Sequence, residues 1–362
     1  MNKPTFLFLL FLFFISCATK SNRYQMSTEA ACLFEQLKSV SVNHILFGHQ
    51  DALSCGIGWQ GIKDESDVKR VAGDYPALFG WEIGNIGDEN NLDGVPFDSI
   101  ISYTQRVHRM GGVNSFSWHA RHPVTNNSAW IINDADVSSL LPDGENHDYL
   151  IGKLDLVADF MHQLKDDDDN LIPVIFRPWH DMNGNLFWWG AKTCSSSDYI
   201  ALFRFTVNYL RINKELNNIL IAYSPDADAK NSEMYLACYP GDDFVDILGI
   251  DNYADFRNNR LDNIVKKISF VVDLANQKGK IAAFTETGND KLTIPNWYTT
   301  NLLQVLKANE KTRSLAYVMV GRNKDAEQFY VPYNEHPQAN DFRYFIKDNL
   351  ILLLEDYNKT KK

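Results

Sequence analysis

The feature that most limits the fold of this chain is a unit that recurs along most of its length. Each unit has a short apolar, β-rich run, then a loop, and then a longer segment whose apolar positions recur at helical spacing. Near-continuous apolar runs of this kind are typical of strands buried on both faces of a parallel sheet. Eight such strand–helix units predict a (β/α)8 barrel, the TIM barrel fold. The eight runs span residues 45–50, 76–84, 111–119, 172–180, 218–226, 245–253, 280–288 and 315–323.

Polar side chains gather where these runs end. In a barrel of this type the carboxyl ends of the strands form one rim, and the active site lies there. Polar residues also mark strand ends in general, but such stop signals favour glycine, asparagine and serine, whereas most residues of this set are types that occur in catalysis. The set predicts an active site on the rim, and it comprises His49, Gln50, Glu82, His119, His180, Asp181, Asp226, Asp251, Tyr253, Glu286, Arg322 and Asn323.

Two carboxylates of this set, Asp181 and Glu286, form the candidate catalytic pair. Cleavage of a glycosidic bond needs one carboxyl group that protonates the leaving oxygen and a second that attacks or assists at the anomeric carbon. The two residues stand at the ends of the fourth and seventh runs, so only the fold can bring them together. Arg177 offers a planar fork that can orient a carboxylate and favour its ionised form. His180 and Asn183 can hydrogen-bond sugar hydroxyls or a neighbouring carboxylate.

Aromatic side chains are dense just after Asp181. They offer flat apolar faces against which pyranose rings can stack, but they can equally pack in the core between helix and strand. We expect core packing for at least one of them. The residues concerned are Trp179, Phe187, Trp188 and Trp189.

The segment RPWHDMNGNLFWWG, which begins at Arg177, resembles the signature R-P-x-H-E-M-N-G-x-W-F-W-W-G of glycoside hydrolase family 26. This family contains retaining β-mannanases and related β-glycanases on a (β/α)8 barrel. The segment AAFTETG resembles the part of the family that holds the catalytic nucleophile. ILFGHQ, FGWEIG, SWHARHP, IDNY and AYVMVGRN resemble other family segments in the same order, so the resemblance covers most of the chain after about residue 40.

The resemblance implies roles for individual residues. Glu286 would be the nucleophile and Asp181 the general acid and base. Tyr253 would hydrogen-bond the nucleophile, and His180 would contact the sugar at the cleavage site. Trp188 and Trp189 would line the cleft near the leaving group, and His119 would contact the sugar elsewhere in it. The substrate-binding residues that we expect are His119, Arg177, His180, Trp188, Trp189, Tyr253 and Arg322.

Two positions depart from the family pattern. Asp181 stands where the family has glutamate, and Gly321 stands where it often has tryptophan. The shorter acid is expected to lower the rate or to require a backbone shift, because retaining chemistry places the carboxyl groups about 5 to 5.5 Å apart. Glycine at 321 is expected to remove stacking surface and open the cleft.

The expected function is hydrolysis of β-1,4-mannosidic bonds in mannan or manno-oligosaccharides. One alternative is a glycan-binding protein with little or no catalysis, and another is the same chemistry on a β-glucan or β-xylan. No metal or organic cofactor is expected, and we expect a monomer.

The amino-terminal residues suggest export. One lysine precedes an apolar run over residues 6–15, which is too short to span a bilayer as a stop-transfer helix. Ser16 followed by Cys17 resembles the lipobox of bacterial lipoproteins, although an ordinary cleaved signal peptide would also fit. We expect a signal peptide over 1–16, a tether and N-terminal segment over 17–40 that starts at a diacylated Cys17, and one catalytic domain over 41–356. The protein would be lipid-anchored to the bacterial outer membrane, on its periplasmic face or at the cell surface.

Composition excludes other classes of partner. The formal net charge of −11 argues against nucleic acid, which is bound by clustered lysine and arginine. The four remaining cysteines, which are Cys32, Cys55, Cys194 and Cys238, show no metal-binding spacing. Three pairings of them are possible, and we expect no disulfide. The acidic run over 166–169 is expected to be a solvated turn rather than a metal site.

Overall fold

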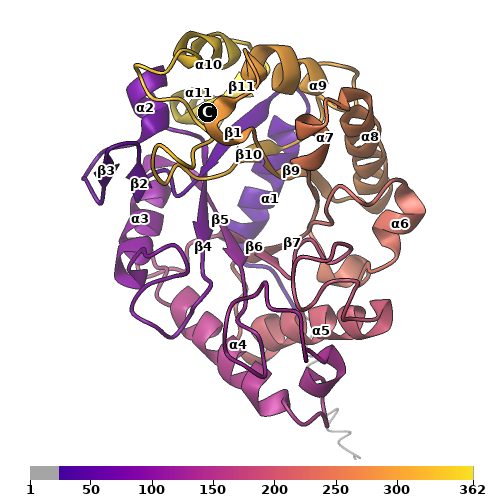
Figure 1. The fold of residues 1–362 in the computed structure, drawn as a ribbon. Helices are drawn as coiled ribbons and strands as arrows, with labels where there is room; N and C mark the ends of the chain where they lie inside the picture. Colours follow the sequence, from indigo (N-terminus) through magenta and orange to yellow (C-terminus); the bar gives the residue numbers. More distant parts are fainter. Residues whose placement is uncertain (1–23, 362) are drawn as a thin grey trace, which may run out of the picture.

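The computed structural model describes residues 24–361, so the predicted signal peptide and the lipidation of Cys17 lie outside the described residues. Eight parallel strands pair in chain order, and the last returns to the first, which closes a barrel (Figure 1). The predicted (β/α)8 fold is thus confirmed, and each predicted run contains one barrel strand. The strands are β1 (Ile45–Gln50), β4 (Leu78–Glu82), β5 (Val113–Trp118), β6 (Val174–Pro178), β7 (Ile219–Tyr223), β8 (Ile247–Asp251), β9 (Ile281–Thr287) and β10 (Tyr317–Val320).

Three further short strands lie outside the barrel wall. β2 (Cys55–Gly56) and β3 (Trp59–Gln60) form a small hairpin after β1. β11 (Ile351–Leu352) pairs in parallel with the first two residues of β1. Helices surround the strands. They are α1 (Thr28–Val40), α2 (Asp67–Ala72), α3 (Phe97–Met110), α4 (His147–Met161), α5 (Ser196–Asn208), α6 (Ser232–Leu236), α7 (Ala254–Arg257), α8 (Leu261–Lys278), α9 (Gln304–Leu306), α10 (Ala339–Phe345) and α11 (Leu354–Thr360).

The helix α8 illustrates how the sequence sets an element boundary. Its apolar positions Ile264, Ile268, Val271 and Val272 lie on one buried face. The helix ends at Gly279, which takes a left-handed conformation with φ 67° and donates its N–H to the carbonyls of the last turn. Glycine accepts this conformation without a steric penalty, so it can end the helix here.

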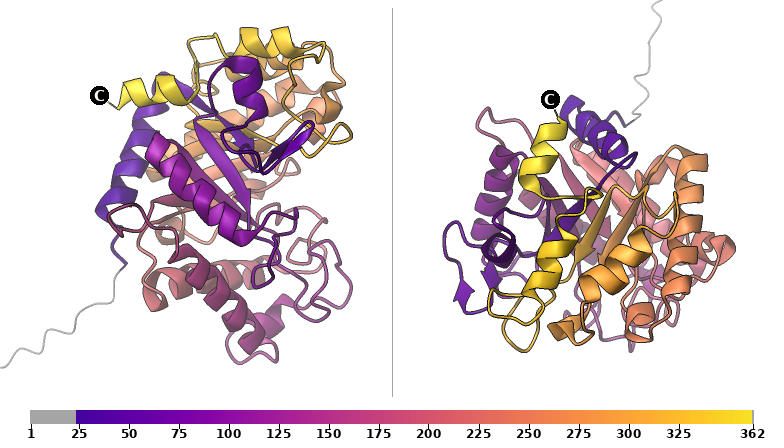
Figure 2. Two further views of the ribbon diagram at one scale, coloured as in Figure 1. Left: turned by 90° about the vertical axis from the view of Figure 1, so that its left-hand side faces the viewer. Right: turned by 90° about the horizontal axis from the view of Figure 1, so that it is seen from above.

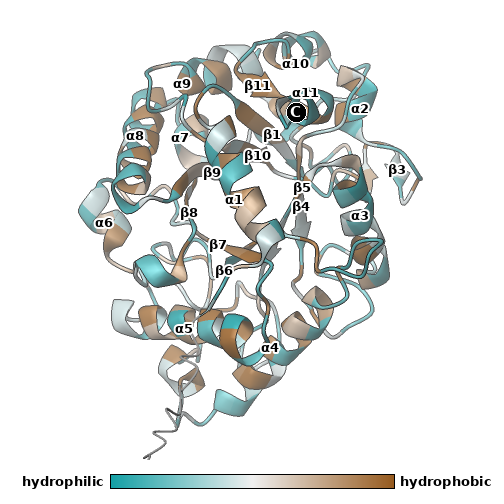
Figure 3. Ribbon diagram, turned by 180° about the vertical axis from the view of Figure 1, so that it is seen from behind, coloured by the Kyte–Doolittle hydropathy of each residue, from teal (hydrophilic) through white to brown (hydrophobic). Residues whose placement is uncertain are grey.

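The core has two layers. Side chains that point outward from the strands, such as Phe176 and Phe284, pack against the surrounding helices. Side chains that point inward, such as Ile175 and Ala283, fill the barrel, together with Leu33 and Leu37 of α1. The helix α1 therefore closes the amino-terminal end of the barrel, and Figure 3 shows it in front of the strands when the molecule is seen from behind.

The described chain enters at this closed end. The N–H of Ser27 donates to the carbonyl oxygen of Asn217 at 2.8 Å, just before β7 begins. The hydroxyl of Tyr24 lies 3.4 Å from the same carbonyl oxygen. Both views of Figure 2 place α1 beside α11, and the hydroxyl of Tyr357 donates to Gln36 at 3.2 Å. Residues 28–40, expected as part of the N-terminal segment, are thus packed on the barrel. None of the helices within residues 24–361 combines the length and apolarity that crossing a bilayer requires.

Candidate active site

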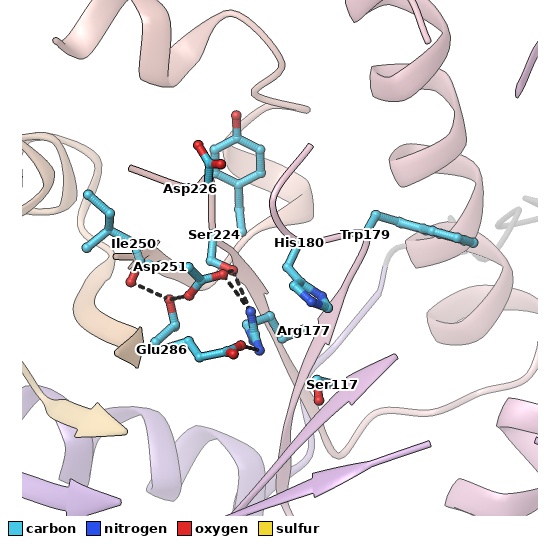
Figure 4. A network of polar contacts seen from close by, with 12 residues as sticks. Ser117, Arg177, Trp179, His180, Ser224, Asp226, Ile250, Asp251 and Glu286 are labelled. Carbon is cyan, nitrogen blue, oxygen red and sulfur yellow. Dashed lines mark hydrogen bonds and ion pairs between the residues drawn. The ribbon is translucent and has the colours of Figure 1, made fainter. Parts of the chain in front are cut away.

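Arg177 is the centre of the site. Two residues after the inward-pointing Ile175, it also points into the barrel, and 2% of its side chain is exposed. Its Nη1 donates to Oδ2 of Asp251 at 2.6 Å, and its Nη2 donates to Oε2 of Glu286 at 2.5 Å (Figure 4). The guanidinium fork holds two carboxylates in fixed positions. The sequence predicts that Arg177 orients a carboxylate, and the structure gives it Asp251 and Glu286.

Glu286 reaches the site because the strand β9 is irregular. Ile250 pairs with Phe284, but the next residue, Asp251, pairs with Glu286, so β9 bulges at Thr285. A bulge changes the direction of the side chains that follow it. Glu286 accepts a second hydrogen bond, from the hydroxyl of Tyr253 at 2.9 Å, and 29% of its side chain is exposed. Both carboxylate oxygens are held in place, while one side of the group stays open.

Asp251 is the second carboxyl group that Arg177 contacts, and it is buried. It accepts from Thr285 Oγ1 at 2.7 Å and from Ser224 Oγ at 3.0 Å, in addition to Arg177. Burial raises its pKa to about 7; Arg177 opposes this shift and the Glu286 carboxylate adds to it. Asp251 therefore shares the positive charge of Arg177 with Glu286.

Asp181 lies in a strained turn after β6. Trp179 and Asp181 have φ values of 53° and 56°, a left-handed conformation that is rare outside glycine. Hydrogen bonds hold the backbone of this turn: Tyr199 Oη donates to the carbonyl of Trp179, Trp189 Nε1 donates to that of His180, and the N–H of Asp181 donates to that of Ser224. Strain that the surroundings enforce in this way is typical of functional sites.

The surroundings of Asp181 favour its protonated form. Burial raises the pKa of this carboxyl well above its ordinary 3.8, and the nearby carboxylates of Asp251, Glu286 and Asp226 raise it further, against Arg177. Its Oδ1 is buried and has no hydrogen-bond partner within the described chain. A raised pKa suits a carboxyl group to the role of general acid.

His119 and Glu82 form a buried ion pair. His119 Nδ1 lies 2.7 Å from Glu82 Oε2, and its backbone N–H donates to Oε1 at 2.8 Å. Burial disfavours both charges, but their mutual attraction and hydrogen bonds outweigh it, so the pKa of His119 is raised and that of Glu82 is lowered. His180 lies behind His119, with the two Nε2 atoms 3.2 Å apart. Burial, together with Arg177 and His119, lowers the pKa of His180 well below its ordinary value, so His180 is neutral.

The expected sugar contacts divide into two groups. A cavity of about 250 Å³ is lined by His119, Tyr253, Glu286 and Arg322, as expected. It is not lined by Arg177 or His180, whose side chains are buried, nor by Asp181.

The tryptophans predicted to line the cleft do not do so. Trp188 and Trp189 are 1% and 0% exposed, and their indole N–H groups donate to the backbone carbonyls of Ala120 and His180. Trp179 is also buried, and Figure 4 shows it pointing away from Arg177 and Glu286. All three rings are packed in the core, which is the alternative that the sequence left open for these residues.

The loops supply side chains that the sequence did not indicate. Trp130 is 46% exposed and stacks on the ring of His119, with centroids 5.0 Å apart and planes at 15°. Asp93 lines the cavity and pairs with Arg322, which also pairs with the buried Asp51 at 3.3 Å. Tyr330 lines the cavity beside Glu286. These loops follow strands that are predictable, but their own paths are set by tertiary contacts.

The cleft is not open at Gly321, contrary to expectation. A Cβ atom built on Gly321 would lie 2.7 Å from Cδ2 and Cε2 of Tyr330. Tyr330 therefore occupies the space that a strand-borne side chain at 321 would need.

Features outside the cavity have structural roles. Asn183 and Asp226 form two hydrogen bonds with each other, each 2.8 Å long.

Asp166 accepts the N–H groups of Asp168 and Asn170 in a turn at the surface, as expected. Between residues 24 and 361, no group of three or more potential ligands is placed to hold a metal ion, and the cysteines are free thiols.

Comparison with known proteins identifies the family. The family model described as glycosyl hydrolase family 26 matches residues 23–313. A mannan endo-1,4-beta-mannosidase of Bifidobacterium adolescentis is 33% identical over 365 residues, which cover 92% of this chain and 35% of that protein. A protein of the same name from Bacillus subtilis is 30% identical, covering 53% of this chain and 54% of that one. The chain thus matches between a third and about half of the length of these curated relatives.

Solved structures match over the whole barrel. A GH26 beta-mannanase from Bacteroides ovatus is 39% identical with a TM-score of 0.87, covering 91% of this chain and 96% of that one. A modular endo-beta-1,4-mannanase from Cellulomonas fimi is 34% identical with a TM-score of 0.86, covering 92% of this chain and 77% of that one. The chain belongs to glycosyl hydrolase family 26.

Proposed function

We propose that this protein is a retaining glycoside hydrolase that cleaves β-1,4-mannosidic bonds in mannan or manno-oligosaccharides. The observation that carries the proposal is the position of Glu286, which Arg177 and Tyr253 hold at the edge of a cavity. The charge of Glu286 is among the causes that raise the pKa of the Asp181 carboxyl group. The names of the similar proteins support β-mannan as the substrate.

In the first step, the Glu286 carboxylate attacks the anomeric carbon of the sugar bound in the cavity. Asp181 donates its proton to the oxygen of the breaking glycosidic bond, and the leaving saccharide departs with that proton. The product of the step is a glycosyl ester on Glu286 and an ionised Asp181. Arg177 and Tyr253 fix the orientation of the nucleophile, which lowers the entropic cost of the attack.

In the second step, water replaces the departed saccharide. The Asp181 carboxylate removes a proton from this water as its oxygen bonds the anomeric carbon, and the bond to Glu286 breaks. Two inversions give net retention of the anomeric configuration. Glu286 is again ionised and Asp181 again protonated, so the cycle closes without any other reactant.

The substitution Glu286→Gln tests the assignment. It keeps the size of the side chain and removes the nucleophile, so turnover of mannan and of an activated aryl mannoside should fall below about one thousandth of the wild-type rate. The unfolding temperature should stay close to that of the wild type. Undiminished turnover would remove Glu286 as the nucleophile. The wild type should be assayed on mannan, β-glucan and β-xylan, with the products resolved by size. Cleavage of β-glucan or β-xylan without cleavage of mannan would show that the proposed substrate is wrong.

A second candidate function is glycan binding with little catalysis. Asp181 favours it, since its carboxyl group is one methylene shorter than the family's glutamate, has a buried oxygen without a partner, and does not line the cavity. Asp181→Glu distinguishes the two. If the short side chain limits proton transfer, this variant should raise kcat on mannan by about tenfold, because misplacement by a bond length can cost that much. An unchanged kcat in an active protein would show that aspartate is already well placed.

A further inference from the structure

Tyr330 fills a slot between the ends of two strands. A Cβ atom on Gly288, after β9, would lie 2.3 Å from Cδ1 of Tyr330, and one on Gly321, after β10, would lie 2.7 Å from Cδ2. Carbon atoms do not approach so closely, so the ring can occupy this place only because both positions are glycine. The two glycines and the tyrosine form one packing unit.

The backbone of Tyr330 is fixed by buried polar groups. Asn323, which is fully buried, accepts the N–H of Tyr330 at 2.8 Å and that of Val331 at 2.9 Å. Its amide also donates to the buried Asp67 at 2.7 Å. Tyr298 Oη donates to the carbonyl of Tyr330 at 2.7 Å. These hydrogen bonds fix the backbone of Tyr330 and leave its side chain available to a ligand.

The ring lies next to the proposed nucleophile. Tyr330 and Glu286 line the same cavity, and the ring of Tyr330 is 5.7 Å from that of Tyr253, whose hydroxyl holds Glu286. A sugar whose anomeric carbon reaches Glu286 must therefore lie against this aromatic wall. Pyranose rings have an apolar C–H face that packs well on an aromatic surface, and such a wall fixes the plane of the ring.

We propose that Tyr330 is a substrate-binding residue whose ring packs against the sugar unit that reacts with Glu286, in the place of a tryptophan at position 321. This inference rests on the proposed function. The aromatic wall is present, but it comes from the loop after β10 instead of from the strand end.

Kinetics of three single variants test the contact. Tyr330→Ala should lower kcat/KM on manno-oligosaccharides by about tenfold, since an aromatic packing contact of this kind is worth roughly one factor of ten. Tyr330→Phe should stay within about threefold of the wild type, because the ring is kept. Tyr344→Ala is the matched control, as this tyrosine is 69% exposed on α10 and does not line the cavity. Unfolding temperatures of all variants show whether a loss reflects folding.

A rescue variant separates sugar packing from a merely structural role. The backbone of Gly321 does not have a positive φ, and the three atoms nearest to a Cβ atom at this position all belong to the ring of Tyr330, so removing the ring removes these contacts. Gly321→Trp alone should lower kcat/KM, because both rings compete for one space. Gly321→Trp combined with Tyr330→Ala should recover at least about threefold over Tyr330→Ala alone, because a ring again covers the sugar.

The outcomes are distinct. If the wild type cleaves mannan and Tyr330→Ala behaves like Tyr344→Ala, the inference about Tyr330 is overturned and the proposed function stands. A loss without recovery in the double variant, with an unfolding temperature lowered in parallel, would also overturn it. If the wild type cleaves no β-glycan and binds none, both the proposed function and this inference fall.

Discussion

At the scale of single residues, the half-buried carboxyl group of Asp181 makes the stability of the protein depend on pH. Its pKa is raised in the folded protein above its ordinary 3.8, because burial and neighbouring carboxylates disfavour the charge. Between pH 3.8 and the raised pKa, the folded state therefore binds more protons than the unfolded state. The free energy of unfolding must fall as the pH rises through this window.

The substitution Asp181→Asn removes this contribution. The variant should unfold at the same temperature as the wild type near pH 4, and about 1 to 2 °C above it at pH 8, a shift that corresponds to roughly 1 kcal/mol. Activity should be lost at every pH. The measurement is thermal unfolding across this pH range, with Asp228→Asn as the control, because Asp228 is exposed and bonds Asp226 only through its backbone. A difference that stays constant with pH would contradict the assigned shift.

At the scale of secondary-structure elements, the bulge in β9 places two successive side chains in one site. A regular strand would point Thr285 and Glu286 to opposite faces. Here the hydroxyl of Thr285 bonds Asp251, and the carboxylate of Glu286 bonds Arg177. The strand thus supports the nucleophile and its buried neighbour together.

The substitution Thr285→Val should expose this coupling. It keeps the shape of the side chain and removes one hydrogen bond to Asp251, which should lower the free energy of unfolding by about 1 to 2 kcal/mol. Because Asp251 shares Arg177 with Glu286, kcat should fall as well. Thr287→Val is the matched control, since its hydroxyl bonds the carbonyl of Asn252 at 2.8 Å. Equal kcat values in the two variants would show that the hydroxyl of Thr285 serves folding alone.

The barrel strands could be predicted from the sequence, but the loops could not. Runs such as 172–180 are mostly apolar, and this pattern is typical of strands that are buried on both faces of a parallel sheet. Glu286 and Arg177 were predictable because they lie near the carboxyl ends of such runs. Trp188 and Trp189 were not placed correctly, since an aromatic pair beside a polar cluster has the same appearance in a core as in a cleft. Tyr330 carries no local signal, because its position depends on glycines 42 and 9 residues earlier in the chain.

At the scale of the whole molecule, the barrel separates two ends with different tasks. The rim carries Arg177, Asp251 and Glu286, whereas α1 closes the opposite end. Ser27 and Tyr24 bond the backbone just before β7, at that closed end. We therefore propose that export and lipidation through Cys17, which the sequence predicts, attach the protein by the end that does not bind sugar.

Fractionation of cells tests the anchor. Wild-type protein should sediment with membranes and release into detergent, whereas Cys17→Ala should remove the acylated residue and abolish this behaviour. Cys32→Ala is the control, because Cys32 is an exposed free thiol on α1 and its loss should leave the distribution unchanged. Soluble wild-type protein would show that the cysteine at 17 is incidental.

The proposed anchor would also set an orientation, because the described chain begins beside β7. A polymer too large to diffuse beneath a lipid surface can reach an enzyme there only if the catalytic opening faces the surrounding medium. The first described residues dock on the far side of the barrel from Glu286, so the proposed anchor would turn the catalytic opening away from the membrane.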